Sequence, residues 1–186
     1  TNPGWLTALP WKCQIFSTLS VLNCELCRFM QFIFLANLPQ AIPTVADWYY
    51  QEWGAFNPNL SPASIAANLE NSLNTEELPL VLLALDQGDL LGVVELKYRE
   101  MAMYPEKEHW LGGMYIRPDC RGRGVGKKLI EHALEVAARL GVRTLHLQTE
   151  QLDGGLYRRL GWRPVEQVNN KGIQVLVMER DICSSV

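Results

Sequence analysis

The sequence predicts an α+β fold, in which a mixed, mostly antiparallel twisted sheet of about seven strands packs with four helices. Three observations support this prediction. The 186 residues suit one domain with a sizeable core. The expected elements follow the order β-α-α-β-β-β-α-β-α-β-β, in which most neighbouring strands are joined as antiparallel hairpins. A single strand–helix–strand crossover, from residues 109–116 to residues 144–149, adds one parallel pair.

The composition is that of an ordinary globular protein, with 48% apolar and 20% charged residues. The net charge of −3 gives no global basic field for nucleic acid, and no apolar run reaches the roughly 18 residues of a membrane span. The five cysteines are odd in number and scattered, and Cys24-x-x-Cys27 has no second pair at zinc spacing. We therefore expect reduced thiols, no metal site and a cytoplasmic protein.

Residues 1–29 have no clear period and mix tryptophans, prolines and three cysteines. We expect them to be an N-terminal extension of unclear role, with the domain proper covering residues 30–186. The apolar run 31–36 after Met30 predicts the first strand. Helical spacing predicts a helix over 39–54, and Ser61-Pro62 predicts the cap and first turn of a second helix that runs to about Asn74.

A buried strand is predicted over 79–85, and the turn at 86–89 leads to its hairpin partner over 90–98. This second strand carries Glu95 between two apolar residues, so the carboxylate either faces solvent or serves a site. Residues 99–107 are predicted to be a polar loop.

The strand over 109–116 contains Gly112-Gly113, which indicates a bulge or a close backbone approach. An amphipathic helix follows to Leu140. A strand over 144–149, a short helix over 154–160 and a final hairpin of strands 162–168 and 173–179 complete the order. The apolar face of the amphipathic helix is formed by Leu129, Ile130, Ala133, Leu134, Ala137 and Leu140.

The loop between strand 109–116 and this helix holds three glycines and two arginines in six residues, Arg121 to Gly126. Free N–H groups and the positive end of a helix dipole favour a phosphorylated ligand there, although a plain solvated basic loop is the alternative. A P-loop would need glycine in place of Arg121 and Ser or Thr in place of Lys128. A dinucleotide fingerprint starting at Gly122 would need glycine in place of Lys127. Both motifs fail, whereas Arg/Gln-x-x-Gly-x-Gly/Ala fits Arg121, Gly124 and Gly126.

This spacing resembles the acetyl-CoA pyrophosphate loop of the GNAT N-acetyltransferase superfamily. Residues 115–126 are close to the family's loop pattern, and Leu156-Tyr157-Arg158-Arg159-Leu160-Gly161-Trp162 is close to its short helix and following strand. The element order over residues 31–180 is also similar to the GNAT fold, whereas residues 1–29 have no recognised counterpart. The resemblance implies that the sheet is splayed at its parallel pair.

The resemblance implies acetyl-CoA as cosubstrate. The loop would hold the pyrophosphate on its N–H groups, and its basic side chains would add charge for the phosphates. In the family, the pantetheine arm pairs with the splayed strand like an added β-strand, here with the main chain of three residues. The cofactor-binding residues so implied are Met114, Tyr115, Ile116, Arg121, Gly122, Arg123, Gly124, Val125, Gly126 and Lys127.

Two catalytic residues are expected. Tyr157 matches the family tyrosine that faces the thioester sulfur, where a phenol can protonate the leaving thiolate. Glu95 is the first choice of general base, because its strand lies beside the loop strand; Glu108 and His109 are the second choice. Cys120 lies before the phosphate loop and not at the splay point, so an acyl-cysteine route is not expected.

The expected function is direct acetyl transfer to the primary amine of a small molecule, with no nucleic-acid or membrane partner, and a homodimer is compatible with the sequence. Trp53, Phe56 and Asn57 are candidates to line the acceptor site, and Asp47, Glu52 and Glu95 are few acidic groups for an aminoglycoside. Two alternatives stay open: a non-catalytic sensor that binds acyl-CoA, and an interaction module whose aromatic first helix and leader form an oligomer interface.

Overall fold

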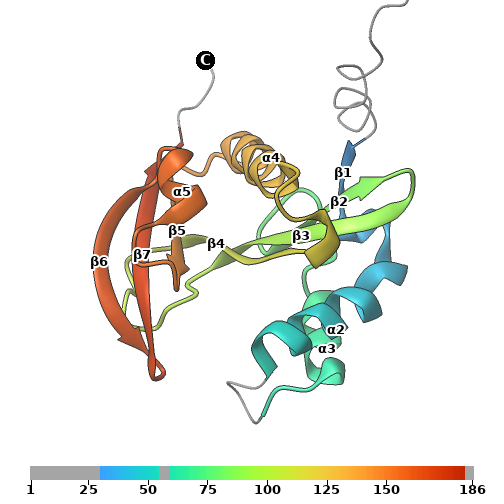
Figure 1. Cartoon of the computed structure of the whole chain (residues 1–186), viewed down its shortest axis with the longest axis horizontal. Coiled ribbons are helices and arrows are strands. Elements are labelled where there is room, and N and C mark those ends of the chain that lie inside the picture. Colours follow the sequence, from blue (N-terminus) through green and yellow to red (C-terminus); the bar gives the residue numbers. More distant parts are fainter. Residues whose placement is uncertain (1–29, 55–58, 183–186) are drawn as a thin grey trace, which may run out of the picture.

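Seven strands form one sheet in the order β1-β2-β3-β4-β5-β7-β6 within the residues that the computed structural model describes, 30–54 and 59–182 (Figure 1). Every neighbouring pair is antiparallel except β4 and β5, which are parallel. The seven strands and the single parallel pair confirm the predicted sheet, while the expected extension 1–29 lies outside the described residues. The strands are Met30–Phe34 (β1), Leu80–Asp86 (β2), Asp89–Tyr98 (β3), His109–Ile116 (β4), Thr144–Thr149 (β5), Arg163–Asn170 (β6) and Ile173–Asp181 (β7).

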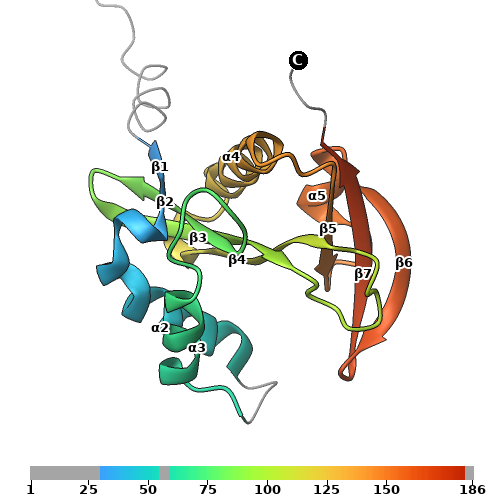
Figure 2. The same ribbon diagram turned by 180° about the vertical axis from the view of Figure 1, so that it is seen from behind.

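The described residues form the four predicted helices, which cover the two faces of the sheet. Helices α2 (Ile42–Trp53) and α3 (Pro62–Glu70) pack on one face, and α4 (Val125–Arg139) and the short α5 (Gly155–Arg159) pack on the other (Figures 1 and 2). None of the helices in the described part of the chain is long and apolar enough to cross a membrane. Three short 3₁₀ segments complete the elements of the described residues: η1 (Leu35–Asn37), η2 (Pro39–Ala41) and η4 (Pro118–Cys120).

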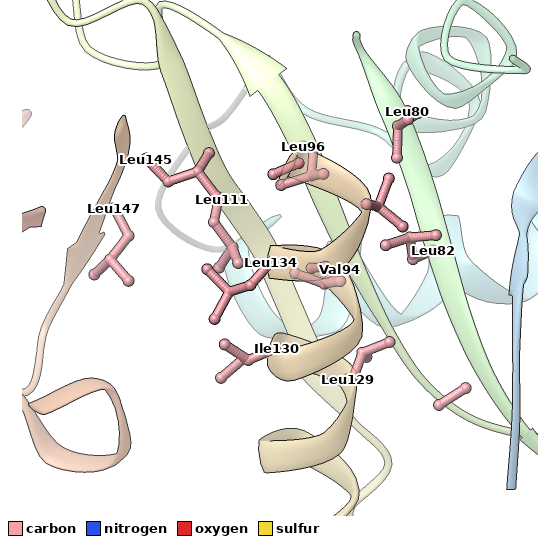
Figure 3. Close-up of a cluster of buried hydrophobic side chains, with 14 of the residues drawn as sticks. Leu80, Leu82, Val94, Leu96, Leu111, Leu129, Ile130, Leu134, Leu145 and Leu147 are labelled. Atoms are coloured by element: carbon pink, nitrogen blue, oxygen red, sulfur yellow. The ribbon is translucent and has the colours of Figure 1, made fainter. Parts of the chain in front are cut away.

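Helix α4 is attached to the sheet by its predicted apolar face. Leu129, Ile130 and Leu134 point from the helix toward Val94 and the leucines of the strands beneath it (Figure 3). Leu129 and Ile130 have no exposed surface, and burying a side chain of this size stabilises the fold by about 1.5–3 kcal/mol. This packing fixes the start of α4, and hence the loop before it, relative to β4.

Helix α3 begins where the sequence predicts and ends earlier. Ser61 accepts a hydrogen bond from the Ser64 N–H (3.1 Å), and the Ser64 hydroxyl bonds the Ser61 N–H (2.9 Å), so a capping box holds the first turn. The helix stops at Glu70 and not near Asn74. The Asn74 side chain donates to Pro79 O (2.6 Å) and accepts from the Glu77 N–H (3.1 Å), which stabilises a turn in place of further helix.

The face that carries α2 and α3 holds two separate apolar clusters. One lies between those helices and strands β1 to β3, and the other lies farther along the sheet, over β4 and β7. The second cluster corrects the prediction of a polar loop over 99–107, because Met101 and Tyr104 from that segment are buried against Trp110. A strip of polar side chains lies between the two clusters and is described below.

The parallel pair of β4 and β5 is joined at one register position within the described residues, Trp110 opposite His146. Beyond that position the rest of β4, up to Ile116, has no partner on its β5 side. This opening agrees with the splay expected at the parallel pair.

The antiparallel pair of β3 and β4 contains a bulge. Val93 lies opposite Tyr115, but Glu95 lies opposite Gly112, so Gly113 and Met114 of β4 together face the single residue Val94, and β4 has one extra residue. Gly113 has a φ of +54°, a conformation that side chains disfavour. The bulge predicted at Gly112-Gly113 is therefore present, in the part of β4 that lacks a β5 neighbour.

Candidate active site

The loop before α4 has the backbone of an anion-binding site. Gly122 and Gly124 both have left-handed conformations, with φ of +76° and +81°, and Gly124 is the N-cap of the fifteen-residue helix α4. No side chain caps that end of the helix. Since the first-turn N–H groups of an α-helix lack partners inside the helix, they point outward here together with the positive end of the dipole. We call residues 121–127 the glycine loop.

Basic side chains surround the glycine loop, and they are arranged in two ways. Arg123 and Lys127 are exposed, and Lys127 is paired only loosely with Glu131 (3.8 Å). Arg121 instead turns toward α2. Its Nε donates to Ile116 O (2.9 Å), and its guanidinium lies 5.5 Å from the centre of the Tyr115 ring.

The contacts of Arg121 tie the loop to α2. A guanidinium nitrogen lies 3.6 Å from a carboxylate oxygen of Glu52, and the Tyr115 ring beneath it stacks on Trp48 at 5.0 Å. The Tyr115 side chain is thus buried in packing, and a contribution of its main chain to cofactor binding stays a prediction. Arg121 as a phosphate ligand stays a prediction.

The glycine loop, the opened segment of β4 and helix α5 meet at Gly126. A Cβ added there would stand 3.2 Å from Met114 Cε, 3.5 Å from Ile116 Cγ1 and 3.6 Å from Leu156 Cδ2. A larger residue would therefore separate the loop from the strand. This convergence brings Tyr157, the residue after Leu156, to the same side of the sheet as the glycine loop.

Tyr157 is held in an apolar setting on α5. Its ring packs edge-on against Trp162, with the centroids 6.1 Å apart, and contacts the core beneath α4. Burial raises the pKa of Tyr157 to about 12. The phenol is therefore protonated at neutral pH and can donate a hydrogen bond.

Glu95 lies on the opposite face of the sheet, directly over the bulge. A Cβ on Gly113 would clash with Glu95 Oε1 and would lie 2.5 Å from the Tyr49 hydroxyl. That hydroxyl donates to Gly113 O (2.6 Å). Burial, and then the Glu95 carboxylate, raises the pKa of Tyr49. Both side chains thus fit against the strand only because residue 113 has no side chain.

Further polar residues extend from Glu95 toward β5 and β6, across the opening between β4 and β5. Lys97 Nζ lies 3.6 Å from Glu95 and 2.9 Å from Glu100, and Glu100 accepts a hydrogen bond from Gln148 of β5 (3.1 Å). Asn170 of β6 donates to Gln148 (2.8 Å). We call the six residues the polar strip: Tyr49, Glu95, Lys97, Glu100, Gln148 and Asn170.

The second choice of general base lies elsewhere. Glu108 is exposed, 4.0 Å from Arg99, and the His109 ring packs against Tyr98 at 5.5 Å. Both residues precede Trp110, where β4 is still joined to β5. The geometry therefore favours Glu95, which lies over the opened segment.

The expected acceptor residues are described only in part. Trp53 packs edge-on against Tyr49 at 5.1 Å, whereas Phe56 and Asn57 lie outside the described residues. Sequence reasoning did not single out Tyr49, Lys97, Glu100 or Gln148. A signal was present, because Glu95 and Lys97 are two apart on one strand, and so share a face beside Gly112-Gly113.

Other chemistries find little support in the described ranges. The described residues contain no group of three or more His, Cys, Asp or Glu side chains that could hold a metal ion. Cys120 is buried, and its Sγ lies 3.6 Å from an oxygen of Asp119, which leaves it poorly accessible to an acyl donor.

A left-handed glycine loop at a helix start, beside a parallel strand pair that opens, is the arrangement of a protein that binds a phosphorylated cofactor with an extended arm. The model of the acetyltransferase (GNAT) family matches residues 42–162. The chain belongs to this family.

Individual relatives agree with that membership. The peptidyl-lysine N-acetyltransferase YjaB of Salmonella typhimurium is 31% identical over 87 residues, which are 47% of this chain and 52% of the relative. The match thus spans about half the length of that protein. The structure of yncA from Salmonella typhimurium, a candidate acetyltransferase solved with its cofactor acetyl-CoA, has a TM-score of 0.67 at 16% identity over 84% of this chain and 95% of its own.

An aminoglycoside 6'-N-acetyltransferase solved with coenzyme A has a TM-score of 0.63 at 18% identity, over 83% of this chain and 97% of its own. At these identities the two structures establish the GNAT fold and leave the acceptor of this chain open.

Proposed function

We propose that this protein transfers the acetyl group of acetyl-CoA directly to the primary amine of a small molecule. One observation carries the proposal. The opened segment of β4 has the glycine loop and Tyr157 on one face of the sheet, and Glu95 on the other. A thioester lying in the opening would thus have a proton donor on one side and a carboxylate on the other.

The residues present fit acetyl-CoA. The N–H groups from Gly122 to Gly126 would hold the pyrophosphate, Arg121, Arg123 and Lys127 would add positive charge, and the open main chain of Met114, Tyr115 and Ile116 would pair with the pantetheine arm. When bound, acetyl-CoA supplies an activated acetyl group as a thioester. The structural neighbours solved with acetyl-CoA and with coenzyme A support this choice of cofactor.

The charge of the glycine loop makes the first prediction. Replacing Arg123 and Lys127 together by glutamine should weaken acetyl-CoA binding about 5- to 30-fold, because each exposed charge pair contributes roughly 0.5–1 kcal/mol. Isothermal titration would measure Kd, and kcat should stay close to the parent value. Lys171→Gln, in the distant turn between β6 and β7, is the matched control; an unchanged Kd in the double variant would contradict the assignment.

The acceptor must lose a proton before it attacks. An alkyl amine with a pKa near 10 costs about 4 kcal/mol to deprotonate at pH 7, and a neighbouring carboxylate can accept that proton. Glu95 is placed for this role over Gly113. The nitrogen then forms its bond to the acetyl carbon as the carbon–sulfur bond breaks. The nitrogen loses its second proton to solvent, and the departing thiolate takes the proton of Tyr157, which regains one from solvent.

A thiol-release assay tests the proposal. The full chain with acetyl-CoA should release free thiol only when an amine is added from a panel of small primary amines, polyamines, an aminoglycoside and a lysine peptide. The lysine peptide represents the second candidate acceptor. The reason to include it is the similarity of this chain to the peptidyl-lysine N-acetyltransferase from Salmonella. Binding of acetyl-CoA without amine-dependent release would instead indicate the non-catalytic sensor.

Tyr157→Phe should lower kcat about 10- to 100-fold and leave the Kd of acetyl-CoA unchanged, because it removes only the proton donor. Since the pKa of Tyr157 is about 12, its ionisation should cause no loss of rate across the neutral and mildly alkaline range. Steady-state kinetics and titration measure the two effects. Tyr50→Phe, an exposed tyrosine on α2, is the control, and an unchanged kcat in Tyr157→Phe would remove this role.

A further inference from the structure

Two adjacent glycines of β4 make room for charged side chains. Of these, Lys97 and Glu100 have no role in the proposed chemistry so far. Over Gly112, an added Cβ would lie 2.5 Å from Lys97 Cε and 2.6 Å from Glu100 Oε2. Over Gly113, it would meet Glu95 and Tyr49. The two pairs therefore lie side by side on the bare backbone of the opened segment, with Lys97 next to Glu95.

Lys97 is fixed from the side away from Glu95. Its ammonium makes a close pair with Glu100 (2.9 Å), and Glu100 is held by Gln148, which is held in turn by Asn170. Gln148 and Asn170 come from β5 and β6, across the opened pair, whereas Glu100 follows β3. Lys97 is only 27% exposed, and Glu95 and Glu100 are each 17% exposed, so solvent screens the interaction less than at the surface.

Burial would lower the pKa of Lys97, but the carboxylates of Glu95 and Glu100 outweigh it, and the pKa is raised. The side chain is therefore a permanent cation at working pH. It is neither a base nor a nucleophile in this state. Its remaining function is to act on its neighbours through charge.

We propose that Lys97 is a positioning residue for Glu95, whose carboxylate it holds over Gly113, where that carboxylate can accept the proton of the amine. This inference rests on the proposed function. The charged and titratable groups facing Glu95 are Tyr49 from α2 and Lys97 from its own strand, with Glu100 beyond Lys97. Among the described groups that face Glu95, Lys97 alone is a cation, so it attracts the Glu95 carboxylate, whereas Glu100 repels it.

The test compares the pH dependence of kcat/KM in three variants. Lys97→Met should move the acidic limb to higher pH by about one unit, because Glu95 without its cation keeps a proton longer. Lys97→Arg keeps the charge and should keep the limb. Glu100→Gln removes an anion, so the limb should move to lower pH. Lys171→Met, in the turn between β6 and β7, is the control for loss of a lysine that pairs with neither Glu95 nor Glu100.

The sign of these shifts separates charge from structure. A purely structural role would lower kcat in Lys97→Met and Glu100→Gln alike without moving the limb, and that result would overturn the inference. If Lys97→Met did not fold, a limb in Glu100→Gln that moved to higher pH would overturn it equally, and one that moved lower would support it.

Glu95→Gln separates this inference from the proposed function. If in that variant the acidic limb of the parent is replaced by a rise that continues to about pH 10, while Lys97→Met keeps the parent profile, then Glu95 is the base and Lys97 does not position it. If Glu95→Gln keeps the limb, the assignment of the base fails, and the role of Lys97 fails with it. Amine-dependent thiol release in the parent remains the separate measure of transfer itself.

Discussion

Glu95→Gln should lower kcat/KM at neutral pH by about 10²- to 10⁴-fold, which is the usual contribution of a positioned general base. Glutamine has nearly the same shape, so the packing over Gly113 and the contact with Tyr49 should persist. The variant must use amine that is already deprotonated in solution. Its rate should therefore rise with pH up to about 10, the pKa of an alkyl amine, and the deficit relative to the parent should shrink along that range.

Rate profiles over pH for the parent and the variant measure this effect. Glu70→Gln, exposed at the end of α3, is the matched control for loss of a carboxylate. Glu108→Gln is a further arm, because Glu108 was the second choice of base. A loss in Glu108→Gln with a normal Glu95→Gln profile would move the assignment to the start of β4.

Gly113→Ala should remove most of the activity and destabilise the fold by about 2–3 kcal/mol. The left-handed conformation at φ +54° costs an alanine roughly 1–2 kcal/mol, and the new methyl group would displace the Tyr49 hydroxyl and the Glu95 carboxylate. Both residues would then leave the opened segment of β4. Thermal unfolding and steady-state kinetics measure the two losses.

A control variant can separate strain from displacement. Gly88, in the turn between β2 and β3, has φ +90° and nothing within 4 Å of an added Cβ, so Gly88→Ala carries strain alone. It should lose stability and keep its activity. Tyr49→Phe, which removes only the hydrogen bond to Gly113 O, should cost about 0.5–1.5 kcal/mol and part of the rate. Full activity in Gly113→Ala would refute the argument.

The sequence was sufficient for elements whose signals are local. Strand β4 and strand β5 occupy their predicted residues, because each is a short apolar run with clear breakers at its ends. The apolar period of α4 likewise predicted its buried face. The glycine loop was found from the spacing of Arg121, Gly124 and Gly126, since backbone conformation there depends on residues that are adjacent in the chain.

The sequence was insufficient where a side chain depends on distant partners. Met101 and Tyr104 are buried by Val175 and Val177, more than 70 residues later, so a segment with polar composition became part of a core. Helix α3 ended early because Asn74 bonds Pro79 O.

The polar strip shows the same difficulty at the site. Its members come from α2, β3, the segment after β3, β5 and β6. Their neighbourhood depends on the bulge and on the opening of the sheet, which no local pattern specifies.

The single joint between β4 and β5 also affects how the molecule should fluctuate. Strands β1 to β4 form one half of the sheet, and β5 to β7 form the other. Within the described residues, backbone pairing connects the two halves only at Trp110 opposite His146. Amide hydrogens of β4 that face this seam should exchange with solvent faster than those of β2 or β7, whose neighbours lie on both sides. Acetyl-CoA bound along the open edge of β4 should slow this exchange. That result would mean that the cofactor completes the sheet between two halves whose backbones pair at one described position.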